Sequence, residues 1–99
     1  FDLEGIRAAV NEKTKMVHIQ RSKGYQTRKT LSVTEIGEVI AFVKSIKPDV
    51  ICMVDNCYGE FVEKIEPSDV GADMIVGSLI KNPGGGLARS GAILREEKI

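Results

Sequence analysis

Three polar side chains in this 99-residue chain follow apolar stretches and could perform chemistry together. Asp55 comes directly after the apolar run at 50–54, while Ser78 and Lys81 follow the apolar run at 72–77. An amine, a carboxylate and a hydroxyl in one cleft suit pyridoxal phosphate: the amine can form a Schiff base, the carboxylate can keep the pyridine nitrogen protonated, and the hydroxyl can bind the phosphate. Each residue alone has an ordinary explanation, as a turn cap or a solvated lysine, so the prediction depends on the fold bringing them together.

The hydrophobic periodicity predicts the elements that must position these residues. Asp2 caps a short helix, and Ser32 with Glu35 forms a capping box that starts a longer amphipathic helix, which Pro48 ends. Short apolar runs bounded by polar or turn residues indicate strands. We expect strands at 14–20, 50–54, 72–77 and 90–94, the longer helix at 32–47, and an irregular connection with a single helical turn between 56 and 71.

Strand, helix, strand, connector and strand follow one another in the order of an α/β sheet. The helix makes a right-handed crossover between parallel neighbours, whereas the connection to the last strand is too short for a crossover helix, so that strand should run antiparallel. The run at 50–54 is apolar throughout, and the run at 72–77 places apolar residues on both faces, as in strands that are buried on both sides. Ligands gather at the carboxyl ends of parallel strands, so the loops that begin at Arg21, Asp55 and Ser78 should form the site.

The loop at 21–29 carries four basic residues. It lies on the correct side of the sheet to meet a substrate carboxylate or a cofactor phosphate, and Arg21 is the residue we favour there; the alternative is an ordinary solvated loop. The glycine-rich run at 84–91 lacks the Gly-Lys-Ser/Thr ending of a P-loop and precedes a strand, which disfavours nucleotide binding. Cys57 stands next to the predicted site, but no sequence feature marks it as a reactive thiol.

Three stretches of the chain closely resemble one family of enzymes. They are Val-Asp-Asn-Cys-Tyr-Gly-Glu-Phe-Val at 54–62, the run at 70–88 that contains Ser-Leu-Ile-Lys-Asn-Pro-Gly-Gly-Gly, and His-Ile-Gln-Arg-Ser-Lys-Gly-Tyr at 18–25. These motifs are similar to those of the methionine gamma-lyase-like family of aluminium resistance proteins. One departure falls at 89–92, where a Pro-Thr-Gly-Gly-like continuation is expected, so these residues receive no role.

The resemblance implies a fold-type I pyridoxal phosphate enzyme related to those of cysteine and methionine metabolism. Such an enzyme would be a C–S lyase that acts on a small-molecule substrate, a sulfur-containing amino acid or a related compound. Lys81 would be the Schiff-base lysine and would also carry the proton of the substrate α carbon. Asp55 would pair with the pyridine nitrogen, and Ser78 would bind the cofactor phosphate. Tyr58 would lie near the phenolic oxygen of the cofactor.

Members of this family are several times longer than this chain. We therefore interpret residues 1–99 as a single segment of the cofactor-binding large domain, part of a mostly parallel sheet in the order β-α-β-loop-β-β. The full-length protein should be a homo-oligomer, a dimer or a tetramer, because such sites draw residues from a second subunit. We expect the 99-residue chain by itself to be inactive. The alternative hypothesis is a noncatalytic α/β fragment or interaction module.

The composition excludes several other classes of function. Fourteen basic and 14 acidic residues give a formal net charge of zero, so no general attraction to nucleic acid or to an acidic membrane surface is expected. The apolar runs are far shorter than the roughly 20 residues of a membrane-spanning helix. The two cysteines are too few for a disulfide framework, and their spacing matches no common zinc pair, so we expect no metal site and a cytoplasmic location.

Overall fold

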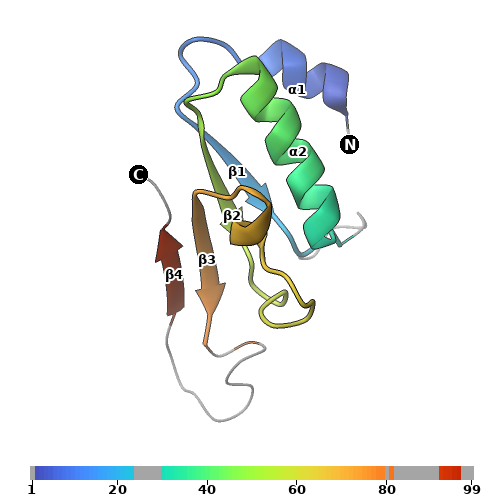
Figure 1. The fold of residues 1–99 in the computed structure, drawn as a ribbon, viewed down its shortest axis with the longest axis vertical. Helices are drawn as coiled ribbons and strands as arrows, with labels where there is room; N and C mark the ends of the chain where they lie inside the picture. Colours follow the sequence, from blue (N-terminus) through green and yellow to red (C-terminus); the bar gives the residue numbers. More distant parts are fainter. Residues whose placement is uncertain (1, 24–29, 80, 82–91, 97–99) are drawn as a thin grey trace.

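The computed structural model describes residues 2–23, 30–79, 81 and 92–96. This part of the chain contains two α-helices, one 3-10 helix and four strands, and Figure 1 shows their arrangement. In chain order they are α1 (Leu3–Ala9), β1 (Met16–Gln20), α2 (Val33–Ile46), β2 (Ile51–Asp55), η1 (Pro67–Val70), β3 (Met74–Ser78) and β4 (Ala92–Glu96).

The four strands form one sheet in the order β1-β2-β3-β4. The first three strands are parallel, with Gln20 opposite Asp55 and Asp55 opposite Val76, so their carboxyl ends lie at one edge. β4 runs antiparallel to β3 and places Ala92 opposite Ser78. The predicted α/β class, the parallel crossover and the antiparallel last strand are therefore all confirmed.

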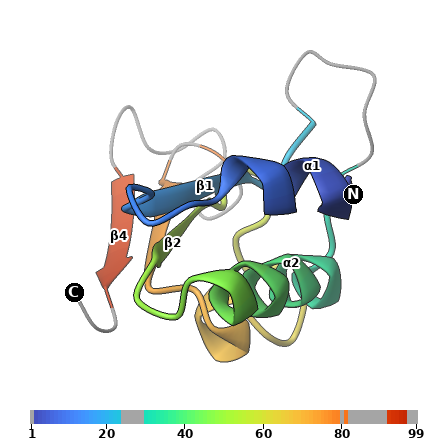
Figure 2. The same cartoon turned by 90° about the horizontal axis from the view of Figure 1, so that it is seen from above.

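α2 provides the crossover between β1 and β2 and covers one face of the sheet. Its N-terminus is closed by the predicted capping box, in which Ser32 Oγ accepts from Glu35 N at 3.1 Å and Glu35 Oε1 accepts from Ser32 N at 3.1 Å. Figure 2 shows α2 and η1 on the same side of the sheet. The helix buries one stripe of apolar side chains: Val33, Ile36, Val39, Ile40 and Val43.

The burial of the strands differs from the prediction of two buried faces. In β2, Cys52 and Val54 are fully buried beneath α2, whereas Ile51 and Met53 on the alternate positions are only half-buried. β3 shows the same alternation. The physical reason is that the helical cover within the described residues lies on one face, so the apolar side chains of the other face keep part of their exposure.

The boundaries of all four strands also differ from the prediction. β1 begins two residues later than expected, at Met16, β2 and β3 extend through the polar residues Asp55 and Ser78, and β4 continues through Glu96. Ladder hydrogen bonds continue through polar residues at strand ends, which an apolar pattern does not register. The helical turn expected between 56 and 71 is present as η1.

None of the helices in the described part of the chain is long and apolar enough to cross a membrane.

Candidate functional site

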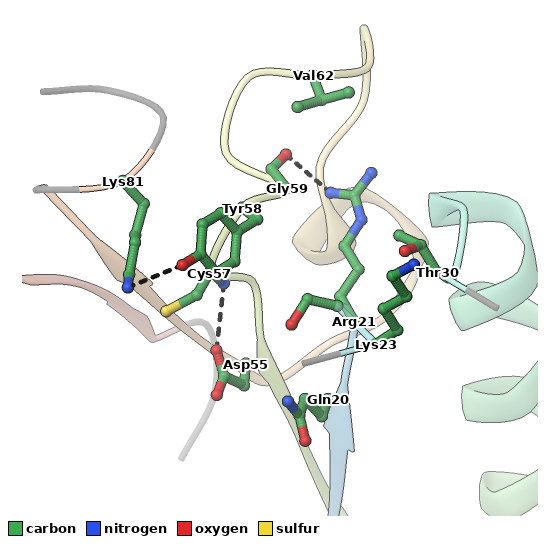
Figure 3. Close-up of a pocket in the computed structure, with 11 residues that line it drawn as sticks. Gln20, Arg21, Lys23, Thr30, Asp55, Cys57, Tyr58, Gly59, Val62 and Lys81 are labelled. Carbon is green, nitrogen blue, oxygen red and sulfur yellow. Dashed lines mark hydrogen bonds between the residues drawn. The ribbon is translucent and has the colours of Figure 1, made fainter. Parts of the chain in front are cut away.

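A cavity of about 550 Å³ opens at the carboxyl ends of β1 and β2 (Figure 3). Asp55 lies at its base, Lys81 reaches it from the segment after β3, and the turn that follows β2 forms one wall. Four of the five residues predicted for the site therefore meet in one cavity. Its lining is Gln20, Arg21, Ser22, Lys23, Thr30, Asp55, Cys57, Tyr58, Gly59, Val62 and Lys81.

Lys81 and Tyr58 contact each other directly within this cavity. Lys81 Nζ donates a hydrogen bond to Tyr58 Oη at 3.1 Å and lies 4.7 Å from the centroid of the phenol ring (Figure 3). The electron-rich ring face and the hydroxyl lone pair both attract the ammonium group of a lysine. The sequence prediction placed Tyr58 beside the cofactor, and it did not foresee this contact with the lysine.

Asp55 is half-buried at the end of β2 and organises the turn after it. Its Oδ1 accepts from Cys57 N at 3.1 Å, the geometry of an Asx turn. Burial, the hydrogen bond to Asp55 and the negative charge of that carboxylate raise the pKa of the Cys57 thiol to about 11. Cys57 is therefore protonated near neutral pH, which disfavours a nucleophilic role for it.

Arg21 lies at the end of β1 with only 3% of its surface exposed. Its Nε donates to Leu31 O at 3.1 Å, and its Nη1 donates to Asn56 Oδ1 at 2.8 Å and to Gly59 O at 2.9 Å. Its Nη2 forms an ion pair with Glu63. The guanidinium thus joins the ends of β1 and β2 to the start of α2, while the predicted contact with a substrate carboxylate stays a prediction.

Two further buried polar residues, Asn56 and Glu60, tie the turn after β2 to the start of η1 and to the end of β3. Asn56 Nδ2 donates to Glu66 Oε2 at 2.8 Å, and Glu60 Oε1 accepts from Ser78 N at 3.0 Å. Sequence reasoning missed both residues. Their partners lie 10 and 18 positions away, so no short-range periodicity marks them; the one available signal is a cluster of polar residues directly after an apolar strand.

Ser78 is the predicted site residue that does not line the cavity. It ends β3 three positions before Lys81 and is half-buried. Residues 82–91, which include the glycine-rich run and the departure at 89–92, lie outside the described residues, as do residues 24–29 of the basic loop.

The chemistry of the cavity fits pyridoxal phosphate. The amine of Lys81 and the carboxylate of Asp55, the two groups that the sequence prediction assigns to this cofactor, line the same space. The volume of about 550 Å³ lies within the range of small-molecule sites.

Comparison with known proteins identifies the family of this chain. A sequence model of the family described as methionine gamma-lyase matches residues 1–98. The uncharacterized protein YnbB of Bacillus subtilis is 58% identical over 94 residues, which are 95% of this chain and 22% of the relative. A Listeria monocytogenes crystal structure, of a provisionally assigned cystathionine beta-lyase involved in aluminum resistance, superposes with a TM-score of 0.93 at 55% identity, over 98% of this chain and 25% of that one.

A more distant structure shares the fold alone. Cystathionine gamma-lyase from Lactobacillus plantarum, solved in complex with L-serine, matches with a TM-score of 0.76 at 20% identity, over 98% of this chain and 24% of that one. The chain thus spans about a quarter of the length of the proteins it matches. Because the family model covers residues 1–98, the chain belongs to the methionine gamma-lyase family, as the resemblance of its motifs predicted.

Proposed function

We propose that this chain is the segment of a pyridoxal phosphate-dependent C–S lyase that carries the Schiff-base lysine, Lys81. The observation that carries the proposal is the convergence of the Lys81 amine, the Tyr58 hydroxyl and the Asp55 carboxylate on one cavity at the carboxyl edge of the sheet. The membership of the chain in the methionine gamma-lyase family supports it. The substrate class is a sulfur-containing amino acid or a related compound, and the full-length protein is a homo-oligomer.

The residues of the cavity divide the work according to their chemistry. Lys81 would hold the cofactor through its amine, and the same amine, when free, would move the proton of the substrate α carbon. Asp55 holds a proton on the pyridine nitrogen, and Tyr58 orients the amine of Lys81 through the hydrogen bond of 3.1 Å. Bound pyridoxal phosphate supplies an electron sink for the carbanion at the α carbon.

Ser78 and Arg21 complete the proposed set of binding residues. Ser78, at the end of β3, binds the cofactor phosphate through its hydroxyl. Arg21 is proposed for the substrate carboxylate, although its nitrogens donate to Leu31, Asn56, Gly59 and Glu63 within the protein. A substrate contact by Arg21 therefore requires that one of these internal contacts be given up.

Borohydride trapping tests the proposal. Full-length protein is incubated with pyridoxal phosphate and reduced, and its mass and peptide map are compared for the wild type, Lys81→Ala and a control, Lys64→Ala, which removes an exposed lysine of the same region. We expect one adduct on Lys81 in the wild type and the control, and none in Lys81→Ala. Scattered adducts, or one adduct that survives Lys81→Ala, would refute the proposal and favour the noncatalytic fragment or interaction module.

A further inference from the structure

Tyr58 holds a backbone conformation that its own side chain does not favour. Its φ is 69°, in the left-handed region that costs a residue with a Cβ about 1–2 kcal/mol. Its side chain does not compensate by packing, because Tyr58 is 58% exposed. Strained residues of this kind persist where the surrounding structure fixes them, and they concentrate at functional sites. The position of the phenol must therefore be determined by the residues on either side of it.

Arg21 holds both sides of this turn. Its Nη1 donates to Asn56 Oδ1 at 2.8 Å, before Tyr58, and to Gly59 O at 2.9 Å, directly after it. Gly59 N in turn donates to Asn56 O at 2.8 Å and closes the turn. The contact is so close that a Cβ on Gly59 would lie 2.5 Å from Arg21 Nη1. One buried guanidinium thus bridges the two residues between which Cys57 and Tyr58 are held.

The hydroxyl that this turn presents meets the amine of Lys81. Because Oη accepts from Nζ, the hydrogen bond is charge-assisted while the amine is protonated and weaker once it is neutral. The contact therefore favours the protonated amine, whereas attack on a carbonyl carbon requires the free lone pair. Any change in the position of Tyr58 changes the share of lysine that is ready to react.

We propose that Arg21 is a positioning residue that acts through Asn56 and Gly59 to hold the Tyr58 hydroxyl against the Lys81 amine, and so sets the reactivity of that amine. The inference rests on the proposed function, which gives Lys81 its task. It assigns Arg21 a role that requires no contact with substrate or cofactor. Arginine suits this role because Nη1 bridges Asn56 and Gly59 while Nε and Nη2 hold Leu31 and Glu63, a set of contacts that the single nitrogen of a lysine could not make.

Competitive acetylation tests this proposal without the cofactor. The cofactor-free full-length protein is labelled with limiting acetic anhydride at slightly alkaline pH, and the acetylation rate of Lys81 is read by peptide mass relative to exposed Lys64 in the same sample. The variants are Tyr58→Phe, Arg21→Gln and the double variant. We expect Tyr58→Phe to raise the relative rate about threefold, the size of a partly exposed charge-assisted hydrogen bond. Arg21→Gln should raise it similarly, and the double variant no further.

The double variant distinguishes a positioning role from a merely structural one. If Arg21→Gln raises the rate equally with Tyr58 present and in the Y58F background, or leaves it unchanged, the proposal is wrong. Should Arg21→Gln fail to fold, Asn56→Ala removes one side of the bridge and takes its place in the same comparison. Tyr58→Phe alters an exposed hydroxyl and keeps the fold, and an unchanged rate in this variant also overturns the proposal. Because pyridoxal phosphate is absent, failure here is separate from failure of the borohydride test.

Discussion

Replacing Gly59 by alanine should destabilise the protein, because the new methyl group would enter the Arg21 network. A Cβ at this position would lie 2.5 Å from Arg21 Nη1, 2.6 Å from Arg21 Cδ and 2.7 Å from Asn56 Oδ1. These distances are about 1 Å shorter than ordinary van der Waals contact. Among the described glycines Gly71 has the positive φ, so alanine can adopt the backbone conformation of Gly59 and the contact alone determines the cost.

The magnitude follows from what must move. The Arg21 guanidinium is buried and held by several hydrogen bonds, so it cannot retreat without stretching those to Asn56 Oδ1 and Gly59 O. Two hydrogen bonds at about 1 kcal/mol each and an overpacking cost of about 1–2 kcal/mol give a loss of about 3–4 kcal/mol in the free energy of unfolding. Urea denaturation followed by far-UV circular dichroism measures this loss as a shift of the midpoint at constant slope.

Gly5→Ala is the matched control. Its Cβ would also lie 2.5 Å from a side-chain atom, but that atom is Asp2 Oδ2, the end of an exposed side chain. Asp2 can rotate away at the loss of its capping bond to Gly5 N, which costs about 1 kcal/mol, and alanine favours the helix by about the same amount. We therefore expect a net change within about 1 kcal/mol in either direction. If Gly59→Ala cost no more than Gly5→Ala, the Arg21 network would be soft and the reasoning about its rigidity would be refuted.

Three further predictions concern titration and capping. The pKa of Cys57 is raised to about 11 from an ordinary 9.0, so its thiolate is about 100-fold scarcer than that of a free thiol but more nucleophilic. Alkylation of Cys57 by iodoacetamide should therefore be about tenfold slower than alkylation of a free thiol, and Asp55→Asn should speed it up. An alkylation rate equal to that of a free thiol would contradict the raised pKa. Burial alone would raise the pKa of Asp73, but hydrogen bonds from Lys44 Nζ at 2.7 Å and Cys52 N at 2.9 Å lower it below 3.8. The stability that this ion pair contributes is present above the pKa of Asp73 in the unfolded chain and is lost as the pH falls through its pKa in the folded protein. Asp73→Asn should therefore flatten the acid limb of the curve of unfolding free energy against pH. An unchanged acid limb would show that Asp73 does not contribute to it. Ser32→Ala removes the capping hydroxyl of α2 and should lower the free energy of unfolding, measured by urea denaturation, by about 1 kcal/mol. The control is Ser45→Ala, which changes an exposed serine in the last turn of α2 and should lower the free energy of unfolding less.

The local rules of the sequence were sufficient for most of the fold. The capping box at Ser32 and the apolar stripe of α2 depend on contacts between residues three or four positions apart, which a sequence displays directly. The strand order followed from the short connection before β4 and from the crossover through α2. The predictions of the strand ends and of the burial of the second sheet face were less accurate, because both features depend on neighbouring elements that the sequence of a single strand does not specify.

The sequence likewise predicted some features of the candidate site and missed others. Residue types and the carboxyl edge of the sheet were sufficient to predict that Asp55 and Lys81 share one cavity, and the family resemblance added Tyr58 to them. The sequence did not show that Arg21 is buried, because its partners Asn56 and Gly59 are 35 and 38 positions away and polar residues are ordinarily exposed.

The sequence by itself therefore determined which chemical groups stand at the carboxyl ends of the strands, since hydrophobic periodicity and chain direction are local properties. Only the tertiary structure decided how those groups are held. It placed Arg21 between two loops, set Tyr58 at a φ of 69° and brought its hydroxyl within 3.1 Å of the Lys81 amine. The physical reason is that a buried guanidinium is stable only where several acceptors from distant parts of the chain converge on it.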